Sequence, residues 1–465
     1  MQQQARMTLD AWLRWLEAAH PVDIDLGLER VAEVARRMGL LDAPLASRVI
    51  TVAGTNGKGS TVAMLESLAL AHGLSTASYT SPHLLRYNER LRLSGEEAGD
   101  AALIDGFEAV EAARYADAAQ QRDEISLTYF EAGTLGALHV IRQRRPDLAI
   151  LEVGLGGRLD AVNVIDADVA VVTTIAQDHA SFLGDDIGVI GWEKAGIMRP
   201  GQPAVLGSSS LPASVSETAK AQGAPLHALG ESFSYRVTDG DDTTAQGQSW
   251  RWSGLDAQGR ACHLDGLPDP GLPLDNAATA LQALGLAGVT LDAAACRQAL
   301  AQVQLPGRMQ WYGQWCLDVG HNPHAAHYLA QRLAWHLAKR PAEQTTKGRM
   351  LGLLGMLGDK DAEGVIDALA PVIDAWLPVS LSGPRARQAD ELARLLDDRG
   401  HRVLHRASSP LAGAGWLAER LAPEDRVLVC GSFFTVAEVL GALQAGELGT
   451  EGDTPGDDHS CEETT

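Results

Sequence analysis

A glycine-rich heptad directly after an apolar run is the feature that most constrains this chain of 465 residues. The apolar run is Val49 to Ala53, and Gly54-Thr-Asn-Gly-Lys-Gly-Ser60 follows it. Glycines let backbone N–H groups curl toward phosphate oxygens, the next helix presents its positive N-terminal end, and one ammonium neutralises the outer phosphates. The heptad therefore predicts a strand, a loop and a helix that bind a nucleoside triphosphate, with Lys58 as the ammonium.

The spacing of this heptad departs from the common phosphate-binding pattern GxxxxGK[ST], because a third glycine stands between the lysine and the serine. The difference argues against a P-loop GTPase. A glycine-rich turn without a ligand is the competing interpretation, but three glycines around one lysine are hard to explain by turn geometry alone. The whole loop is thus a candidate for binding a nucleoside triphosphate, which the resemblance described below implies to be ATP, with Ser60 placed to reach Mg²⁺ or a phosphate: Gly54, Thr55, Asn56, Gly57, Lys58, Gly59 and Ser60.

Strand-like runs alternate with helical patterns in the first half of the chain, which predicts a parallel α/β sheet. Ligands of such sheets bind beyond the carboxyl ends of the strands. Loops that begin at Ser81, Gly154 and Gln177 follow strand candidates, so we expect them to converge with the heptad on one site. The strand candidates are Val49 to Ala53, Thr76 to Thr80, Leu148 to Val153 and Val169 to Ile175.

The length of the chain predicts two or three domains. Short alternating pieces predict a small β insertion over about residues 207–273, and Leu305-Pro-Gly-Arg308 has the composition of a linker. A second alternation of strands and helices follows it. We predict an α/β protein: a P-loop-containing parallel-sheet ATPase domain over residues 1–304, a smaller Rossmann-like α/β domain over 305–445, and an acidic disordered tail over 446–465.

The net charge of −22 includes seven acidic residues in that tail, and the remainder is still too acidic to favour a nucleic-acid partner. The five cysteines form no CxxC pair, which fits a reducing compartment. No run approaches the ~18 to 20 apolar residues of a membrane span, and the N-terminus lacks a secretory apolar region. We therefore expect a cytoplasmic protein that binds neither nucleic acid nor membranes.

Three polar residues of the first domain are candidates for chemistry. Glu152 ends a strand before a glycine-rich loop, where a carboxylate suits Mg²⁺, although an ion pair with Arg158 is the alternative. His179 follows the next strand and gains weight from the predicted nucleotide beside it, although a lone histidine is more often structural. Lys194 lies in a predicted helix ahead of a glycine, where a plain surface lysine is an equally good interpretation.

In the second domain, Asp318-Val-Gly-His-Asn-Pro-His324 sits at a predicted strand end. His321, His324 and His327 raise the possibility of zinc, but no cysteine or glutamate completes the usual ligand set. We favour a helix start at Asn322-Pro323 with Asp318 and His321 hydrogen-bonded to a ligand.

Eight segments in this order resemble the Mur ligase superfamily and, within it, the folylpolyglutamate synthase and dihydrofolate synthase family. The resemblance covers about Leu9 to Leu443. The segments are Gly54 to Ser60, Ser81-Pro-His-Leu84, Leu127-Thr-Tyr-Phe-Glu131, Glu152-Val-Gly-Leu-Gly-Gly-Arg-Leu-Asp160, Glu193-Lys-Ala-Gly-Ile197, Leu305-Pro-Gly-Arg308, Asp318 to His324 and Cys430-Gly-Ser-Phe433.

The resemblance implies an ATP- and Mg²⁺-dependent ligase that is a monomer and acts on small molecules. Its substrates would be L-glutamate with dihydropteroate, giving dihydrofolate, and L-glutamate with reduced folates, giving folylpolyglutamates. Each reaction would pass through an acyl phosphate. Folylpolyglutamate synthesis alone is the alternative within this class, and a slow nucleotide-hydrolysing regulatory module is the alternative from another class.

The resemblance also implies roles for individual residues. Ser81, Glu152 and His179 match the metal ligands, and Lys194 matches a carbamylated lysine; Lys58, Lys194 and His179 would be catalytic. Further nucleotide contacts would come from Asn276, Arg308, Asp318 and His321. The pterin substrate would contact three segments: Asp25, Leu26, Gly27 and Leu28; Thr128, Tyr129, Phe130 and Glu131; and Leu159, Asp160 and Ala161.

Overall fold

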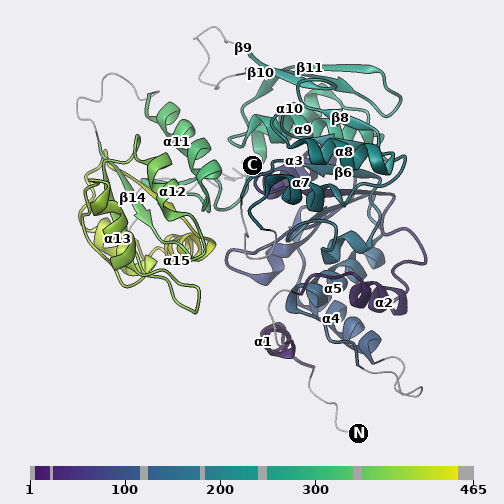
Figure 1. Cartoon of the computed structure of the whole chain (residues 1–465), viewed down its shortest axis with the longest axis horizontal. Helices are drawn as coiled ribbons and strands as arrows, with labels where there is room; N and C mark the ends of the chain where they lie inside the picture. The colour runs from purple at the N-terminus through teal and green to yellow at the C-terminus, as the bar shows by residue number, and fades with distance from the viewer. Residues whose placement is uncertain are drawn as a thin grey trace, which may run out of the picture. The chain divides into compact units, whose positions relative to one another are not determined.

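The computed structural model describes residues 6–20, 25–115, 124–177, 184–238, 249–338 and 348–448 (Figure 1). The chain divides into two compact units between Leu305 and Pro306. Each unit contains a mainly parallel sheet covered by helices, so the predicted α/β class is confirmed. Within the described ranges, no helix is both long and apolar enough to cross a membrane.

The large sheet of the first unit has, in its described part, the strand order β4-β3-β2-β5-β1-β6-β7-β8. Strands β2, β5, β1, β6, β7 and β8 pair in parallel, whereas β3 and β4 form an antiparallel edge. The bounds are β1 (Arg48–Ala53), β2 (Thr76–Tyr79), β3 (Leu91–Leu93), β4 (Glu96–Glu97), β5 (Leu148–Glu152), β6 (Val169–Val172), β7 (Ala204–Leu206) and β8 (Leu226–Ala228).

Helices cover both faces of this sheet, which explains why β1, β5 and β6 are buried at every position except Arg48. Successive residues of β1 point to opposite faces of the sheet, and two groups of helices contact them. Val49 packs with the first group, whereas Ile50 and Val52 pack with the second. The first group is α1 (Leu9–Ala19), α2 (Glu29–Arg37), α4 (Asp100–Arg114) and α5 (Tyr129–Arg144). The second is α3 (Lys58–Ala71), α9 (Leu274–Leu286) and α10 (Ala293–Gln302).

The antiparallel insertion is shorter than predicted. Strands β9 (Ser234–Thr238), β10 (Ser249–Leu255) and β11 (Ala261–Pro268) form a small sheet around the buried Trp250 and Trp252. The earlier part of the predicted range 207–273 instead holds α8 (Ala213–Gln222) and β8 of the large sheet, and α7 (Ile187–Ala195) packs against α8. The sequence of α8 is mostly polar, and only Val215 and Ala219 are buried. It therefore shows no clear helical period of apolar residues.

The sheet of the second unit has the described order β12-β13-β16-β14-β15, in which β12 pairs antiparallel and the others pair in parallel. Its strands are β12 (Gln310–Tyr312), β13 (Trp315–Leu317), β14 (Met350–Leu354), β15 (Ala375–Pro378) and β16 (Arg426–Cys430). Its helices are α11 (Pro323–Ala338), α12 (Ala362–Leu369), α13 (Ala389–Asp398), α14 (Pro410–Ala418) and α15 (Phe433–Gln444).

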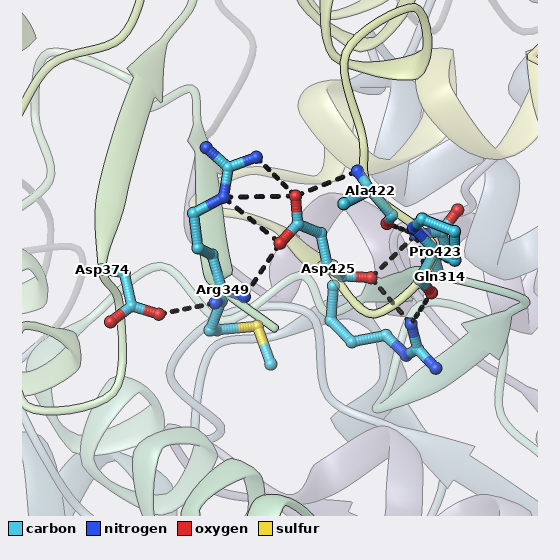
Figure 2. Close-up of polar contacts among 8 residues, drawn as sticks. Gln314, Arg349, Asp374, Ala422, Pro423 and Asp425 are labelled. Carbon is cyan, nitrogen blue, oxygen red and sulfur yellow. Dashed lines mark hydrogen bonds and ion pairs between the residues drawn. The ribbon is translucent and has the colours of Figure 1, made fainter. Parts of the chain in front are cut away.

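A buried carboxylate fixes the amino ends of two strands in this sheet (Figure 2). Asp425 accepts hydrogen bonds from the backbone N–H of Arg349 at 2.8 Å and of Ala422 at 3.1 Å, and it pairs with the Arg349 guanidinium. Gln314 donates to the carbonyls of Ala422 and Asp425 at 2.7 and 2.9 Å. These contacts stabilise the amino ends of β14 and β16. The candidate ligand residues lie at the opposite, carboxyl ends of the strands.

Candidate active site

The glycine-rich loop joins β1 to α3 and requires glycine at two positions. Gly54 has φ +148°, and a Cβ there would lie 1.9 Å from Oγ1 of Thr173. Gly57 has φ +86° and precedes the first residue of α3; a Cβ there would lie 2.7 Å from Nδ2 of Asn276. The loop therefore turns tightly into the N-terminus of α3, where backbone N–H groups lack helical partners and favour anions.

Two threonines after β6 hold this loop in place, and the sequence analysis did not identify them. The N–H of Thr55 donates to the carbonyl of Thr174 at 2.7 Å, and the N–H of Asn56 donates to its hydroxyl at 3.1 Å. The hydroxyl of Thr173 donates to the carbonyl of Asn56 at 2.7 Å. The signal was available, since both threonines follow the apolar run that forms the strand beside β1.

Two lysine side chains converge on one loop carbonyl. Nζ of Lys58 donates to the carbonyls of Gly54 and Thr55 at 3.1 and 3.3 Å, and Nζ of Lys194 donates to the Gly54 carbonyl at 3.1 Å. Lys194 lies one residue before the end of α7 and is buried, so it is not a plain surface lysine. The two nitrogens are within about 6 Å of each other, which concentrates positive charge beside the loop.

Two of the three predicted metal ligands lie next to each other. Glu152 is the last residue of β5, and its Oε2 accepts a hydrogen bond from the N–H of Ser81 at 3.2 Å. A Cβ at Gly59 would lie 3.9 Å from the same Oε2, so the third glycine of the loop faces this carboxylate. Serine and carboxylate oxygens suit Mg²⁺. His179 lies outside the described residues, within which no group of three or more His, Cys, Asp or Glu side chains is arranged to hold a metal ion.

Asn276 connects α9 to the start of α3. Its Nδ2 donates to the hydroxyl of Ser60 at 2.8 Å, and that hydroxyl donates to the carbonyl of Gly57 at 3.0 Å. The structure therefore places Asn276, which is distant in the sequence, directly against the predicted nucleotide loop.

Ion pairs bring together two of the three segments predicted to bind the pterin substrate. Arg30 contacts Oδ2 of Asp25 and Oε1 of Glu131, each at 2.7 Å. Glu131 also accepts from the N–H of Thr128 at 2.7 Å, and the hydroxyl of Thr128 accepts from the N–H of Glu131 at 3.2 Å. This reciprocal cap begins α5 and fixes the orientation of Thr128 to Glu131. Leu26, Gly27 and Leu28 follow Asp25 and lead into α2.

The third segment is ordered by the carboxylate of Asp160. It accepts hydrogen bonds from the N–H groups of Leu155 and Val162, both at 2.9 Å. Burial raises the pKa of Asp160 to about 6, although these backbone bonds oppose the shift. The ring of Phe130 packs on the same loop, since a Cβ at Gly154 would lie 2.5 Å from it. Residues Leu159 to Ala161 are thereby tied to the strand end that carries the candidate metal ligand.

An arginine and its aromatic neighbours form a further polar group that the sequence analysis missed. The guanidinium carbon of Arg90 lies 5.3 and 5.6 Å from the ring centres of Tyr87 and Tyr129. Nε of Arg90 donates to Nδ1 of His83 at 2.9 Å. Burial, and then the Arg90 charge, lower the pKa of His83 to about 4. The one indication of this group in the sequence was that His83 to Arg90 follow Ser81-Pro82, a segment already predicted to lie at the site.

In the second unit, Asp318 follows β13 and is held by backbone groups. Its oxygens accept from the N–H of Met309 at 3.0 Å and of Gly320 at 2.7 Å. Burial raises the pKa of Asp318, whereas the charge of Arg308, whose Nη1 lies 3.9 Å from Oδ1, opposes that shift. Nδ1 of His321 is 2.9 Å from the carbonyl of Val319. The three predicted nucleotide contacts of this unit, Arg308, Asp318 and His321, are thus clustered.

Comparisons with known proteins show the family to which this chain is similar. Residues 307–433 match the family model described as Mur ligase, glutamate ligase domain. A dihydrofolate synthase/folylpolyglutamate synthase of Escherichia coli is 44% identical over 453 residues, covering 96% of this chain and 98% of the relative. The protein of the same name from Haemophilus influenzae is 39% identical, with 96% of this chain and 99% of the relative covered.

Solved structures resemble the chain over almost its whole length. E. coli FolC in complex with DHPP and ADP has a TM-score of 0.84 at 43% identity, with 96% of this chain and 99% of that one covered. A bifunctional folylpolyglutamate synthase/dihydrofolate synthase from Yersinia pestis, complexed with AMPPNP and Mn ion, has a TM-score of 0.82 at 42% identity, with 96% and 100% covered. The chain therefore belongs to the dihydrofolate synthase/folylpolyglutamate synthase family of Mur ligases.

Proposed function

We propose that this chain is an ATP-dependent ligase that adds L-glutamate to dihydropteroate, forming dihydrofolate, and to reduced folates, forming folylpolyglutamates. The single observation that carries the proposal is the convergence of Lys58, Lys194 and the Ser81–Glu152 pair on the glycine-rich loop. Family membership, with 44% identity to the E. coli relative, supports the same activity.

The chemistry requires a carboxylate to be activated before an amine can attack it. A carboxylate oxygen of the pterin substrate attacks the γ-phosphorus of ATP, the bond to the bridging oxygen breaks, and ADP leaves. The amine of glutamate then attacks the acyl carbon of the acyl phosphate, phosphate leaves, and the amine proton passes to solvent. Positioning and charge neutralisation dominate catalysis of phosphoryl transfer. The α3 N-terminus and Lys58 would supply both around the phosphates.

Ser81 and Glu152, with His179, would hold Mg²⁺, whose charge would offset that of the γ-phosphate. The fit is supported by the oxygen-bearing side chains of Ser81 and Glu152, whose residues the parallel pairing of β2 with β5 brings together, with Glu152 facing Gly59. Their role in this chain is to fix where the phosphate lies relative to Lys58.

Carbamylation of Lys194 is the second part of the proposal. Adding CO₂ would convert a buried ammonium beside Lys58 into an anionic group able to support a metal. A Lys194→Ala variant should then lose activity that acetate or propionate partly restores, with Lys220→Ala, an exposed lysine of α8, as the control. Failure of any short carboxylic acid to restore activity would argue against the carbamate.

The pterin substrate would bind to the three segments that Arg30, Asp160 and Phe130 hold in place. Asp25 to Leu28 and Thr128 to Glu131 are linked through Arg30, while Leu159 to Ala161 are ordered by Asp160.

Cytoplasmic location and a monomeric state stay predictions from the sequence and the resemblance.

Release of ADP with paired substrates tests the function directly. Purified protein should release ADP with dihydropteroate plus glutamate and with tetrahydrofolate plus glutamate, and much less when either partner is omitted. Activity with tetrahydrofolate only would leave a folylpolyglutamate synthase. Slow ADP release that ignores both substrates would indicate a nucleotide-hydrolysing module and remove the proposal.

A further inference from the structure

Arg90 is a buried cation that has no acidic partner within the part of the chain that the structure describes. It ends the short helix η1 (Tyr87–Arg90) and is 9% exposed. Its guanidinium lies over the rings of Tyr87 and Tyr129, and its Nε donates to a ring nitrogen of His83. Among the described residues, none of the carboxylates lies within 4.0 Å of its side-chain nitrogens, although the chain is strongly acidic.

Arg114, in the same unit, shows how the fold neutralises a buried arginine. It is 3% exposed and lies over the rings of Trp15 and Tyr115, at 5.6 and 5.4 Å. It also pairs with Glu111 at 3.0 Å and with Glu124. A buried charge is unfavourable unless it is paired, and aromatic faces offset only part of that cost. Arg90 has the aromatic surroundings of Arg114 but lacks its anions.

The groups around Arg90 do not replace that anion. Burial raises the pKa of Tyr129 to about 12, so its phenol is neutral near pH 7. The acceptor in His83 is an uncharged ring nitrogen. The adjacent carboxylate, Glu89, accepts three backbone hydrogen bonds at 2.6 to 2.7 Å instead, from Leu84, Leu85 and Arg86.

The backbone of Arg90 is bonded next to a candidate metal ligand, and its side chain lies against a candidate substrate segment. The carbonyl of Arg90 accepts from the N–H of Thr80 at 2.8 Å, and the next residue, Ser81, contacts Glu152. On its other side is Tyr129 of the Thr128 to Glu131 segment. A carboxylate that is to be phosphorylated must be held between the metal-bound phosphate and the site of the pterin.

We propose that the guanidinium of Arg90 binds a substrate carboxylate in this enzyme. The inference rests on the proposed function, which supplies carboxylates from two sources: the pterin-linked substrate and free glutamate. Arginine suits the task because its planar donors match both oxygens of a carboxylate.

A binding cycle tests this proposal by removing the charge from the protein and from the ligand in turn. Dihydropteroate and its methyl ester are titrated into wild type and Arg90→Met, with a non-hydrolysable ATP analogue present. We expect Arg90→Met to weaken dihydropteroate binding roughly 10- to 100-fold, the worth of a charged hydrogen bond, and to leave ester binding nearly unchanged. Arg48→Met, an exposed arginine at the amino end of β1, is the control.

Each outcome decides the question. If dihydropteroate binding is unaffected but the KM for glutamate rises about tenfold or more, the bound carboxylate belongs to glutamate. Equal losses for acid and ester, with an unchanged KM for glutamate, would overturn the proposal and leave Arg90 a structural residue. Should Arg90→Met fail to fold, Arg90→Lys gives the same comparison, with a smaller loss again confined to the acid. Wild type that lacks ligase turnover would overturn the proposed function itself, whereas equal losses in an active enzyme overturn only the role of Arg90.

Discussion

Two strand-to-helix loops, one in each unit, carry opposite charges at equivalent places in their sheets. The loop between β1 and α3 gathers the ammonium groups of Lys58 and Lys194 at the Gly54 carbonyl. The loop between β13 and α11 instead carries the buried carboxylate of Asp318, which accepts two backbone hydrogen bonds beside Arg308.

Both loops follow the carboxyl end of a parallel strand, where ligands of such sheets bind, but their side chains suit different ligand groups. The ammonium of Lys58 and a helix N-terminus suit phosphate oxygens, and this remains so if Lys194 is carbamylated. A carboxylate fixed by backbone N–H groups retains lone pairs that suit hydroxyl or amine donors. We therefore expect changes in the first loop to affect catalysis and changes in the second to affect nucleotide affinity.

Removing the charge of Lys58 should give the largest effect. Lys58→Ala should lower kcat for ADP release by about 10³-fold or more, because electrostatic groups at the transferring phosphate contribute most to such reactions. Steady-state assays with dihydropteroate and glutamate measure this loss. Lys220→Ala removes an equal charge from an exposed position and should retain activity. Near-normal turnover by Lys58→Ala would show that catalysis does not depend on the positive charge of the first loop.

Glu152→Gln should act through the metal. The amide keeps the shape of the carboxylate but loses its charge, so we expect kcat to fall about 10²-fold and half-maximal activity to need more Mg²⁺. Mg²⁺ titrations of activity measure both quantities, with the exposed Glu217→Gln as control. An unchanged Mg²⁺ requirement would contradict the assignment of Glu152 as a ligand.

Asp160 sharpens the comparison, because it is a second buried carboxylate held by backbone N–H groups. Its folded pKa of about 6 exceeds the ordinary value of 3.8, so the folded protein favours the protonated form. The stability that this group contributes is present below pH 3.8 and is lost as pH rises through about 6. The upper limit of the loss is about 3 kcal/mol.

Asp160→Asn lacks this titration. The free energy of unfolding of the variant, relative to wild type, should therefore rise between about pH 4 and pH 6 and then level off. Denaturant unfolding over a series of pH values measures the change. A difference that does not vary with pH would show that Asp160 titrates normally in the folded protein.

The alternation of apolar runs was enough to predict both parallel sheets, because central strands such as β1 are buried on both faces. It also predicted that the loops beginning at Ser81 and Gly154 would converge, since parallel strands place their carboxyl ends together, whereas the pairing of Ser81 with Glu152 came from the resemblance. Short edge strands, such as β3, β4 and β12, were missed because two or three residues show no period.

The residues that sequence reasoning missed are those defined by contacts between distant segments. Arg90 becomes notable only when the fold brings Tyr129 onto its guanidinium and brings no carboxylate within reach among the described residues. Thr173 and Thr174 matter because β6 lies beside β1, and their place directly after an apolar run was visible in the sequence. The contact of Arg90 with Tyr129, in contrast, leaves no local pattern in the sequence.

Asp318→Asn should give the smallest effect and tests the second loop. The amide keeps one acceptor oxygen but loses the charge beside Arg308, so we expect the KM for ATP to rise about tenfold, the worth of one charged hydrogen bond. The KM for dihydropteroate and kcat should change little, and the exposed Asp390→Asn of the same unit is the control. A fall in kcat comparable to that of Lys58→Ala, with an unchanged KM for ATP, would mean that both loops act on the transferring phosphate. Their opposite charges would then not separate a catalytic loop from a nucleotide-binding loop.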